Sequence, residues 1–139
     1  MKKSYILSFI ALVLLATGCS EPVAKFYKAT EVCKLEDGMD LISTEGELVL
    51  PNSFYSSGNS ASLLLKSSLP KDDLPTIVIY FLKERKNTME RIGDNFSEAD
   101  VKIYDNDGNL VKLGEKVRLT GKKISAQCIL YVDKIEKVK

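Results

Sequence analysis

Alternation of apolar and polar positions dominates the body of the chain and predicts short β-strands. Over residues 42–50, Ile42, Leu48 and Leu50 share one face while Glu45 and Glu47 share the other, which is the period of a half-buried strand. A continuous apolar, β-branched run at 76–82 predicts a central strand that is covered on both faces. The same reasoning predicts strands at 61–66, 116–122 and 128–138, and a β-hairpin of 101–104 with 110–113.

Two local features refine this pattern. Gly46 lies inside the first predicted strand and indicates a β-bulge or a sharp bend. The segment 83–92 (KERKNTMERI) is the only plausible helix of the body, and Gly93 is suited to end it. Five principal strands with a short helix between the third and fourth therefore predict a mostly-β domain over 33–139.

The order of these elements resembles the OB-fold, a partly open, five-stranded Greek-key barrel. The segments that carry the likeness to small bacterial OB domains are 45–48 (EGEL), 114–121 (GEKVRLTG) and 132–135 (VDKI). The resemblance implies a five-stranded OB-like barrel with one short helix and an extra β-hairpin. The rival architecture is a lipocalin-like or lysozyme-inhibitor barrel, which requires eight longer strands.

The first nineteen residues have the organisation of an export signal. Lys2 and Lys3 precede an apolar run of residues 5–15, which is shorter than the roughly 20 residues that cross a bilayer. The end of this segment, Leu-Ala-Thr-Gly followed by Cys19, resembles the lipobox of bacterial lipoproteins. That resemblance implies diacylglycerol transfer to Cys19, cleavage after Gly18 and acylation of the new N-terminus. The alternative is a soluble secretory protein with a chance cysteine.

The predicted organisation is a signal peptide at 1–18, a lipidated N-terminus and tether at 19–32, and the barrel. Ser20 follows the acylated position, and by family resemblance it points to the outer membrane rather than to inner-membrane retention. In a Gram-positive host the anchor would lie in the single membrane. Three acyl chains suffice for stable attachment, so we expect a protein held on the bilayer in the cell envelope, facing the periplasm or the cell surface.

Two cysteines remain if Cys19 carries lipid, and export places them in an oxidising compartment. Pairing of Cys33 with Cys128 predicts a structural disulfide. Two separate buried thiols and an active thiol are the alternatives, but two thiols without His or a CxxC spacing make a poor metal site.

Composition narrows the function further. The chain has no His, which excludes Ser-His-Asp and Cys-His nucleophiles and imidazole metal ligands. The formal charge is +1, and loss of Lys2 and Lys3 with the leader leaves 18 basic against 19 acidic side chains, or −1. Nothing in this balance favours nucleic acid. We therefore expect no enzyme, no cofactor and no metal.

Two segments contain closely spaced acidic residues that could bind a cation or act as catalytic carboxylates. The run Asp105-Asn106-Asp107-Gly108-Asn109 resembles a calcium loop, but the later Glu of that pattern is replaced by Gly114, and a hairpin turn explains it. Glu45 and Glu47 are about 7 Å apart along a strand, a separation used by inverting glycosidases. No cleft is readable beside them, so solvent-facing residues are the preferred interpretation.

The candidate binding residues lie in two segments. Phe54 and Tyr55 stand in a Ser/Asn-rich loop at 52–60, where OB-folds contact ligands, although both rings could instead cap the core. Tyr80, Lys83 and Arg85 form a second group of aromatic and basic side chains. We expect a non-enzymatic binding or interaction module that serves assembly, exclusion or protection through another envelope protein or a glycan. The alternatives are a carboxylate-based envelope hydrolase acting on glycan, and an OB domain that binds oligosaccharide or nucleic acid.

Overall fold

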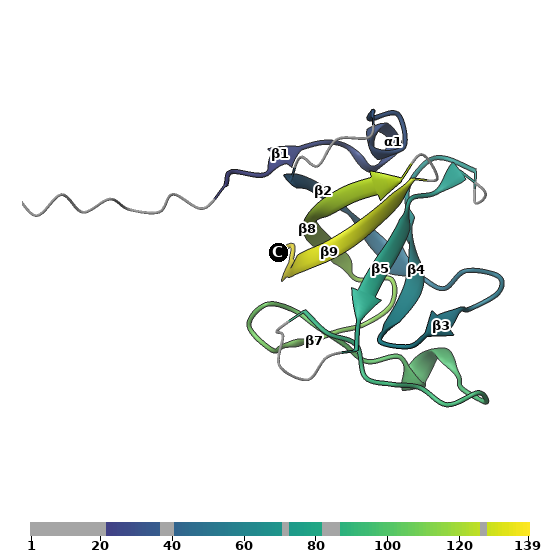
Figure 1. Ribbon diagram of the computed structural model, residues 1–139. Coiled ribbons are helices and arrows are strands. Elements are labelled where there is room, and N and C mark those ends of the chain that lie inside the picture. Colours follow the sequence, from purple (N-terminus) through teal and green to yellow (C-terminus); the bar gives the residue numbers. More distant parts are fainter. Residues whose placement is uncertain (1–21, 37–40, 71–72, 82–86, 126–127) are drawn as a thin grey trace, which may run out of the picture.

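In the computed structural model of the chain, the residues described are 22–36, 41–70, 73–81, 87–125 and 128–139 (Figure 1). Its elements in chain order are β1 (Lys25–Phe26), α1 (Ala29–Val32), β2 (Leu41–Val49), β3 (Ser56–Ser57), β4 (Ser60–Lys66), β5 (Thr76–Tyr80), the 3-10 helix η2 (Glu98–Asp100), β6 (Ile103–Tyr104), β7 (Leu110–Val111), β8 (Lys116–Ser125) and β9 (Ile129–Lys137). No helix among these residues is long and apolar enough to cross a membrane.

Five of the strands close into a barrel. The order of the sheet is β1-β2-β8-β9-β5-β4-β3, and β2 also pairs with β4, which joins the two sides. The pairing of β5 with β9 is parallel, whereas β2–β4, β2–β8, β4–β5 and β8–β9 are antiparallel. This connectivity confirms the predicted mostly-β, five-stranded, OB-like barrel with one short helix and an extra hairpin, β6–β7.

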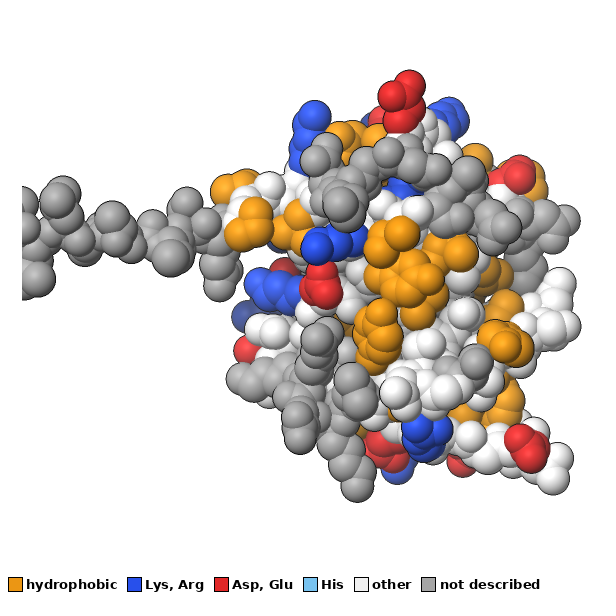
Figure 2. Space-filling model, in the orientation of Figure 1, with side chains coloured by type: hydrophobic (Ala, Val, Ile, Leu, Met, Phe, Trp, Pro, Cys, Tyr) orange, Lys and Arg blue, Asp and Glu red, His pale blue; other side chains and the backbone are white. Residues whose placement is uncertain are grey.

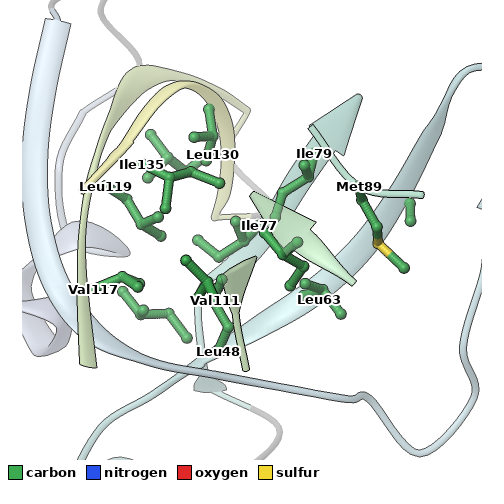
Figure 3. Close-up of a cluster of buried hydrophobic side chains, with 14 of the residues drawn as sticks. Leu48, Leu63, Ile77, Ile79, Met89, Val111, Val117, Leu119, Leu130 and Ile135 are labelled. Carbon is green, nitrogen blue, oxygen red and sulfur yellow. The ribbon is translucent and has the colours of Figure 1, made fainter. Parts of the chain in front are cut away.

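The barrel interior is filled by the inward-facing half of each alternating strand. Leu48, Leu63, Ile77, Leu119 and Leu130 are fully buried and point toward one another (Figure 3). Two residues from the connection between β5 and β8 join them: Val111 from β7 lies among them, and Met89 lies beside Ile79. The period-two pattern of the sequence thus becomes a single continuous core.

Of the two features predicted at Gly46, a β-bulge or a sharp bend, the structure lacks the bulge, and the change of pairing partner beside Gly46 fits a bend. Pairing of β2 with β8 runs without a register shift through Gly46, so there is no bulge, and the strand passes from β8 to β4 at Glu47. A Cβ at Gly46 would lie 2.8 Å from the Leu65 side chain. The irregularity occurs instead between Thr120 and Gly121, where a Cβ on Gly121 would lie 2.0 Å from the carbonyl oxygen of Tyr131.

The predicted helix at 83–92 is wrong over its described part. Residues 82–86 lie outside the described residues, and 87–92 are not helical. Asn87 has a φ of 75°, and Met89 pairs with Ile103 while its N–H donates to the carbonyl of Tyr80 (3.2 Å). Backbone pairing with distant segments therefore replaces the intrahelical hydrogen bonds, and Gly93 caps no helix. The short helix of this fold is α1, which precedes the first barrel strand.

The N-terminal segment is attached to the barrel by packing and by a covalent bond. β1 pairs in parallel with the start of β2, and Val32 of α1 is fully buried. Cys33, directly after α1, forms a disulfide with Cys128 across 95 positions of sequence. The predicted pairing is confirmed, and the two alternatives for these thiols are excluded.

Candidate functional site: the outer face of β4, β5 and β9

The register of three neighbouring strands brings apolar and aromatic side chains together on the outside of the barrel. Val78 of β5 stands between Ser62 of β4 and Tyr131 of β9. In the next row, Thr76 stands between Leu64 and Ile129. We call this surface the outer strand face; it consists of Ser60, Ser62, Leu64, Thr76, Val78, Tyr80, Ile129 and Tyr131.

Burial shows how closely these side chains pack. Val78 is only 8% exposed although it points away from the core, because its neighbours cover it. Leu64, Tyr80, Ile129 and Tyr131 are all partly exposed. Figure 2 shows hydrophobic side chains gathered in the middle of the view, over the positions of β5 and β9 in Figure 1. The face is thus a contiguous apolar surface bordered by serines.

In the loop before β4, the backbone of Tyr55 is hydrogen-bonded to a residue of this face and its ring is exposed. The Tyr55 carbonyl accepts the N–H of Ser62 (3.1 Å), and the Tyr55 side chain is 67% exposed. Phe54 instead packs against the core and meets Phe96 edge-on, with ring centroids 4.9 Å apart. Of the two interpretations of this loop, the geometry fits a capping ring for Phe54 and an accessible ring for Tyr55.

The second predicted group is described only in part. Tyr80 ends β5 opposite Ser60, so it belongs to the outer strand face. Lys83 and Arg85 lie outside the described residues. The described cation nearest in sequence is Arg91, which lies over the Phe81 ring at 5.2 Å and donates to Oδ1 of Asn59 (3.3 Å).

The two strand carboxylates are held in ion pairs on the barrel wall. Glu45 accepts from Arg118 (2.7 Å) and lies 3.1 Å from Nζ of Lys116. Hydrogen bonds from Arg118 and then Lys116 hold the pKa of Glu45 below its ordinary value. Glu47 pairs with Lys66 at 2.9 Å. A carboxyl kept ionised in this way is unsuited to donate a proton as a general acid.

The acidic turn at 105–109 satisfies its own carboxylate. Oδ1 of Asp105 accepts the N–H groups of Asp107 (2.9 Å) and Asn109 (2.8 Å), and Gly108 has a φ of +83°. Burial raises the pKa of Asp105, but these backbone hydrogen bonds and the Asn109 amide outweigh it and leave the pKa below its ordinary value. The geometry is that of a side-chain-stabilised turn. Within the described ranges, no group of three or more His, Cys, Asp or Glu residues is arranged to hold a metal.

Sequence reasoning missed most of the outer strand face. The sequence predicts only that Leu64, Ile129 and Tyr131 lie in strands, because their neighbours depend on which strands pair and in which register. The signal that could have found them is the outward phase of each strand combined with OB strand order, which places 61–66, 76–82 and 128–138 side by side.

No protein-family model and no curated protein matches this sequence. Among solved structures, the chain is similar to the telomere capping protein Ten1 from Saccharomyces pombe, with a TM-score of 0.42 and 12% sequence identity. The match covers 83% of this chain and 81% of that chain. The OB-like class rests on the strand order described above, and this likeness adds nothing about function.

Proposed function

We propose that this chain is a lipid-anchored, non-enzymatic binding module of a bacterial cell envelope. The barrel presents the outer strand face and Tyr55 to its partner, which is another envelope protein or a glycan. The anchor is the acylated Cys19, and the localisation is the outer membrane or, in a single-membrane host, that membrane.

The leader supports the anchor. Its basic start, short apolar core and small residues before Cys19 stand in the order of a lipobox. A disulfide between Cys33 and Cys128 is compatible with export, because such bonds persist in oxidising compartments and are rare in the cytosol.

The observation that carries the binding role is the apolar surface over β4, β5 and β9. An outward-facing strand residue as covered as Val78 needs large neighbours, and here Tyr131 flanks it in the ladder. OB-folds use this side of the barrel and the adjoining loop for ligands. Tyrosines among serines and small aliphatic side chains suit protein and sugar surfaces, because they offer apolar area together with hydroxyl groups.

Charge favours these partners over nucleic acid. Single-stranded nucleic acid requires a basic groove that follows its phosphates. Within the outer strand face as defined, every side chain is uncharged. Of the described cations beside it, Lys66 pairs with Glu47, Arg91 contacts Phe81 and Asn59, and Lys122 of β8 stands opposite Tyr131, so these cations do not form a continuous basic groove.

Site-specific photo-crosslinking in cells that produce the full chain tests this role. A photoreactive phenylalanine analogue at Tyr55 or Tyr131 should give a discrete adduct. The same analogue at Leu110, which is 40% exposed in the β6–β7 hairpin, is the matched control and should give none. Loss of the adduct on protease or on muramidase treatment separates a protein from a glycan partner. Equal adducts at all three positions, or none at Tyr55 and Tyr131, would overturn the proposal.

A further inference from the structure

Exposed apolar side chains stand where the chain enters the domain. Val23 is 94% exposed and Phe26 is 54% exposed. They belong to a small group of large hydrophobic residues with such exposure in the described part of the chain, the others being Tyr55, Leu110 and Ile124. Figure 2 shows hydrophobic and basic side chains side by side at the left, around β1. Leaving both residues in water is unfavourable unless something covers them.

The short distance in sequence between Val23 and Cys19 indicates that the membrane covers these two apolar side chains. Four residues of fully extended chain span at most about 14 Å, so Val23 lies within that distance of the anchored cysteine. Because β1 is paired to β2 through Lys25 and Phe26, the barrel cannot move far from this point. Seven residues separate Cys19 from Phe26, a reach of at most about 25 Å, so a domain tethered so closely can bring Val23 and Phe26 to the lipid headgroups.

The described segment 22–36 carries three exposed lysines, Lys25, Lys28 and Lys34, against two exposed glutamates, Glu31 and Glu36, and the two lysines beside Phe26 suit an anionic bilayer. Lys25 and Lys28 flank Phe26 and are both exposed. A groove of about 670 Å³ adjoins it, lined by Pro22, Ala24, Leu41, Asn106, Thr120, Lys122, Asp133 and Lys134. Exposed apolar residues that alternate with lysines are typical of segments that lie in a membrane interface.

We propose that Val23 and Phe26, with Lys25 and Lys28 beside them, form a second membrane contact that seats the barrel on the phospholipid surface in one orientation. The contact rests on the proposed lipid anchor at Cys19. It turns the β1 side of the domain toward the bilayer. β3, which directly follows Tyr55 in the chain, lies at the opposite end of the barrel and is then turned away from the bilayer (Figure 1).

The absence of Trp from the sequence gives a direct test, since one introduced tryptophan is the only such fluorophore. The full chain, processed and lipidated in cells, is reconstituted into vesicles of zwitterionic and anionic phospholipid with brominated acyl chains. Phe26→Trp should lose most of its emission to the bromine atoms, whereas Tyr55→Trp, the matched control at the far end, should keep its emission.

The lysines give a second readout in the Phe26→Trp background. Each lysine near an anionic surface strengthens attachment about fivefold, so Lys25→Gln with Lys28→Gln should weaken the seated state about 25-fold. Lys102→Gln with Lys112→Gln removes the same charge from the other end and should leave the quenching unchanged.

The outcomes separate the two proposals. A parent chain that does not float with vesicles would overturn the lipid anchor and this contact with it. A chain that floats, but whose tryptophans at 26 and 55 are quenched equally or not at all, would retain the anchor and overturn the contact.

Discussion

The two ends of the barrel are closed by different means. At one end, α1 and the chain around it cover the core with Ala29 and Val32, and the Cys33–Cys128 disulfide fixes them to the start of β9. At the other end, the long connection between β5 and β8 inserts Met89, Val101, Ile103 and Val111 into the core, although η2 and the β6–β7 hairpin are its only described regular elements.

The difference shows two ways to order a segment that has little regular structure. The N-terminal closure adds a cross-link to the pairing of β1 and the burial of Val32, because α1 itself is only four residues long. The connection relies on buried side chains and on polar groups that bind the backbone. Asn87 donates to the carbonyl of Asp133 (2.9 Å) and accepts from the N–H of Ile135, while Asp105 organises its turn. The stability that the N-terminal closure contributes should therefore depend on reductant, whereas the stability that the connection contributes should not.

Removing the cross-link should have the largest effect. Cys33→Ser with Cys128→Ser releases a loop of 95 residues, and the chain-entropy model gives a loss of about 4 to 5 kcal/mol in the free energy of unfolding. Denaturant unfolding of parent and variant, each with and without reductant, measures it. Reductant should destabilise only the parent; an unchanged midpoint would contradict a covalent closure.

Met89→Ala should cause the next largest loss of stability, because it removes a fully buried side chain from the other end of the barrel. We expect a loss of about 2 to 4 kcal/mol, independent of reductant. Met89→Leu is the matched control and should cost less than about 1.5 kcal/mol, since it conserves volume. Similar losses for Ala and Leu would show that packing at Met89 is not what closes this end.

Asp105→Ala should cost about 2 kcal/mol, because the N–H groups of Asp107 and Asn109 lose their acceptor. Asp105→Asn retains an oxygen and should cost less. The lowered pKa of Asp105 sets the sign of the pH dependence: its stabilisation is present above the unfolded-state value of about 4 and is lost as pH falls through the lower folded-state value.

Thermal or denaturant unfolding from neutral pH downward measures this dependence. The stability difference between the parent and Asp105→Asn should narrow in acid below about pH 4. A difference that widens there would contradict the assignment.

The smallest effects separate Phe54 from Tyr55. Phe54→Ala removes a half-buried ring that contacts Phe96 and should cost about 1 to 2 kcal/mol of stability. Tyr55→Ala removes an exposed ring and should change stability by less than about 0.5 kcal/mol. If Tyr55 contacts the partner, its loss should weaken binding about 30-fold. Unfolding curves paired with crosslinking yield distinguish the two; a destabilised Tyr55→Ala protein would contradict its assignment to the surface.

The barrel could be predicted from sequence because each strand carries its own signal. Alternation over 42–50 and the apolar run after Pro75 require no knowledge of partners, and the even pair of cysteines outside the leader predicted the disulfide. The helix prediction at 83–92 was wrong because it used local propensity alone. In the structure, Met89 instead pairs with Ile103 and donates its N–H to the carbonyl of Tyr80. The outer strand face was missed for the same reason, because Tyr131 comes to stand beside Val78 through the parallel pairing of β9 with β5.

The account depends most on the proposed lipid anchor at Cys19, because the proposed compartment, partner class and orientation of the domain all follow from it. Metabolic labelling with palmitate of cells producing the full chain or its Cys19→Ala variant tests it most directly. We predict label in the parent protein and none in the variant, which should accumulate as unprocessed precursor. Equal label in both proteins, or none in the parent, would contradict the lipid anchor.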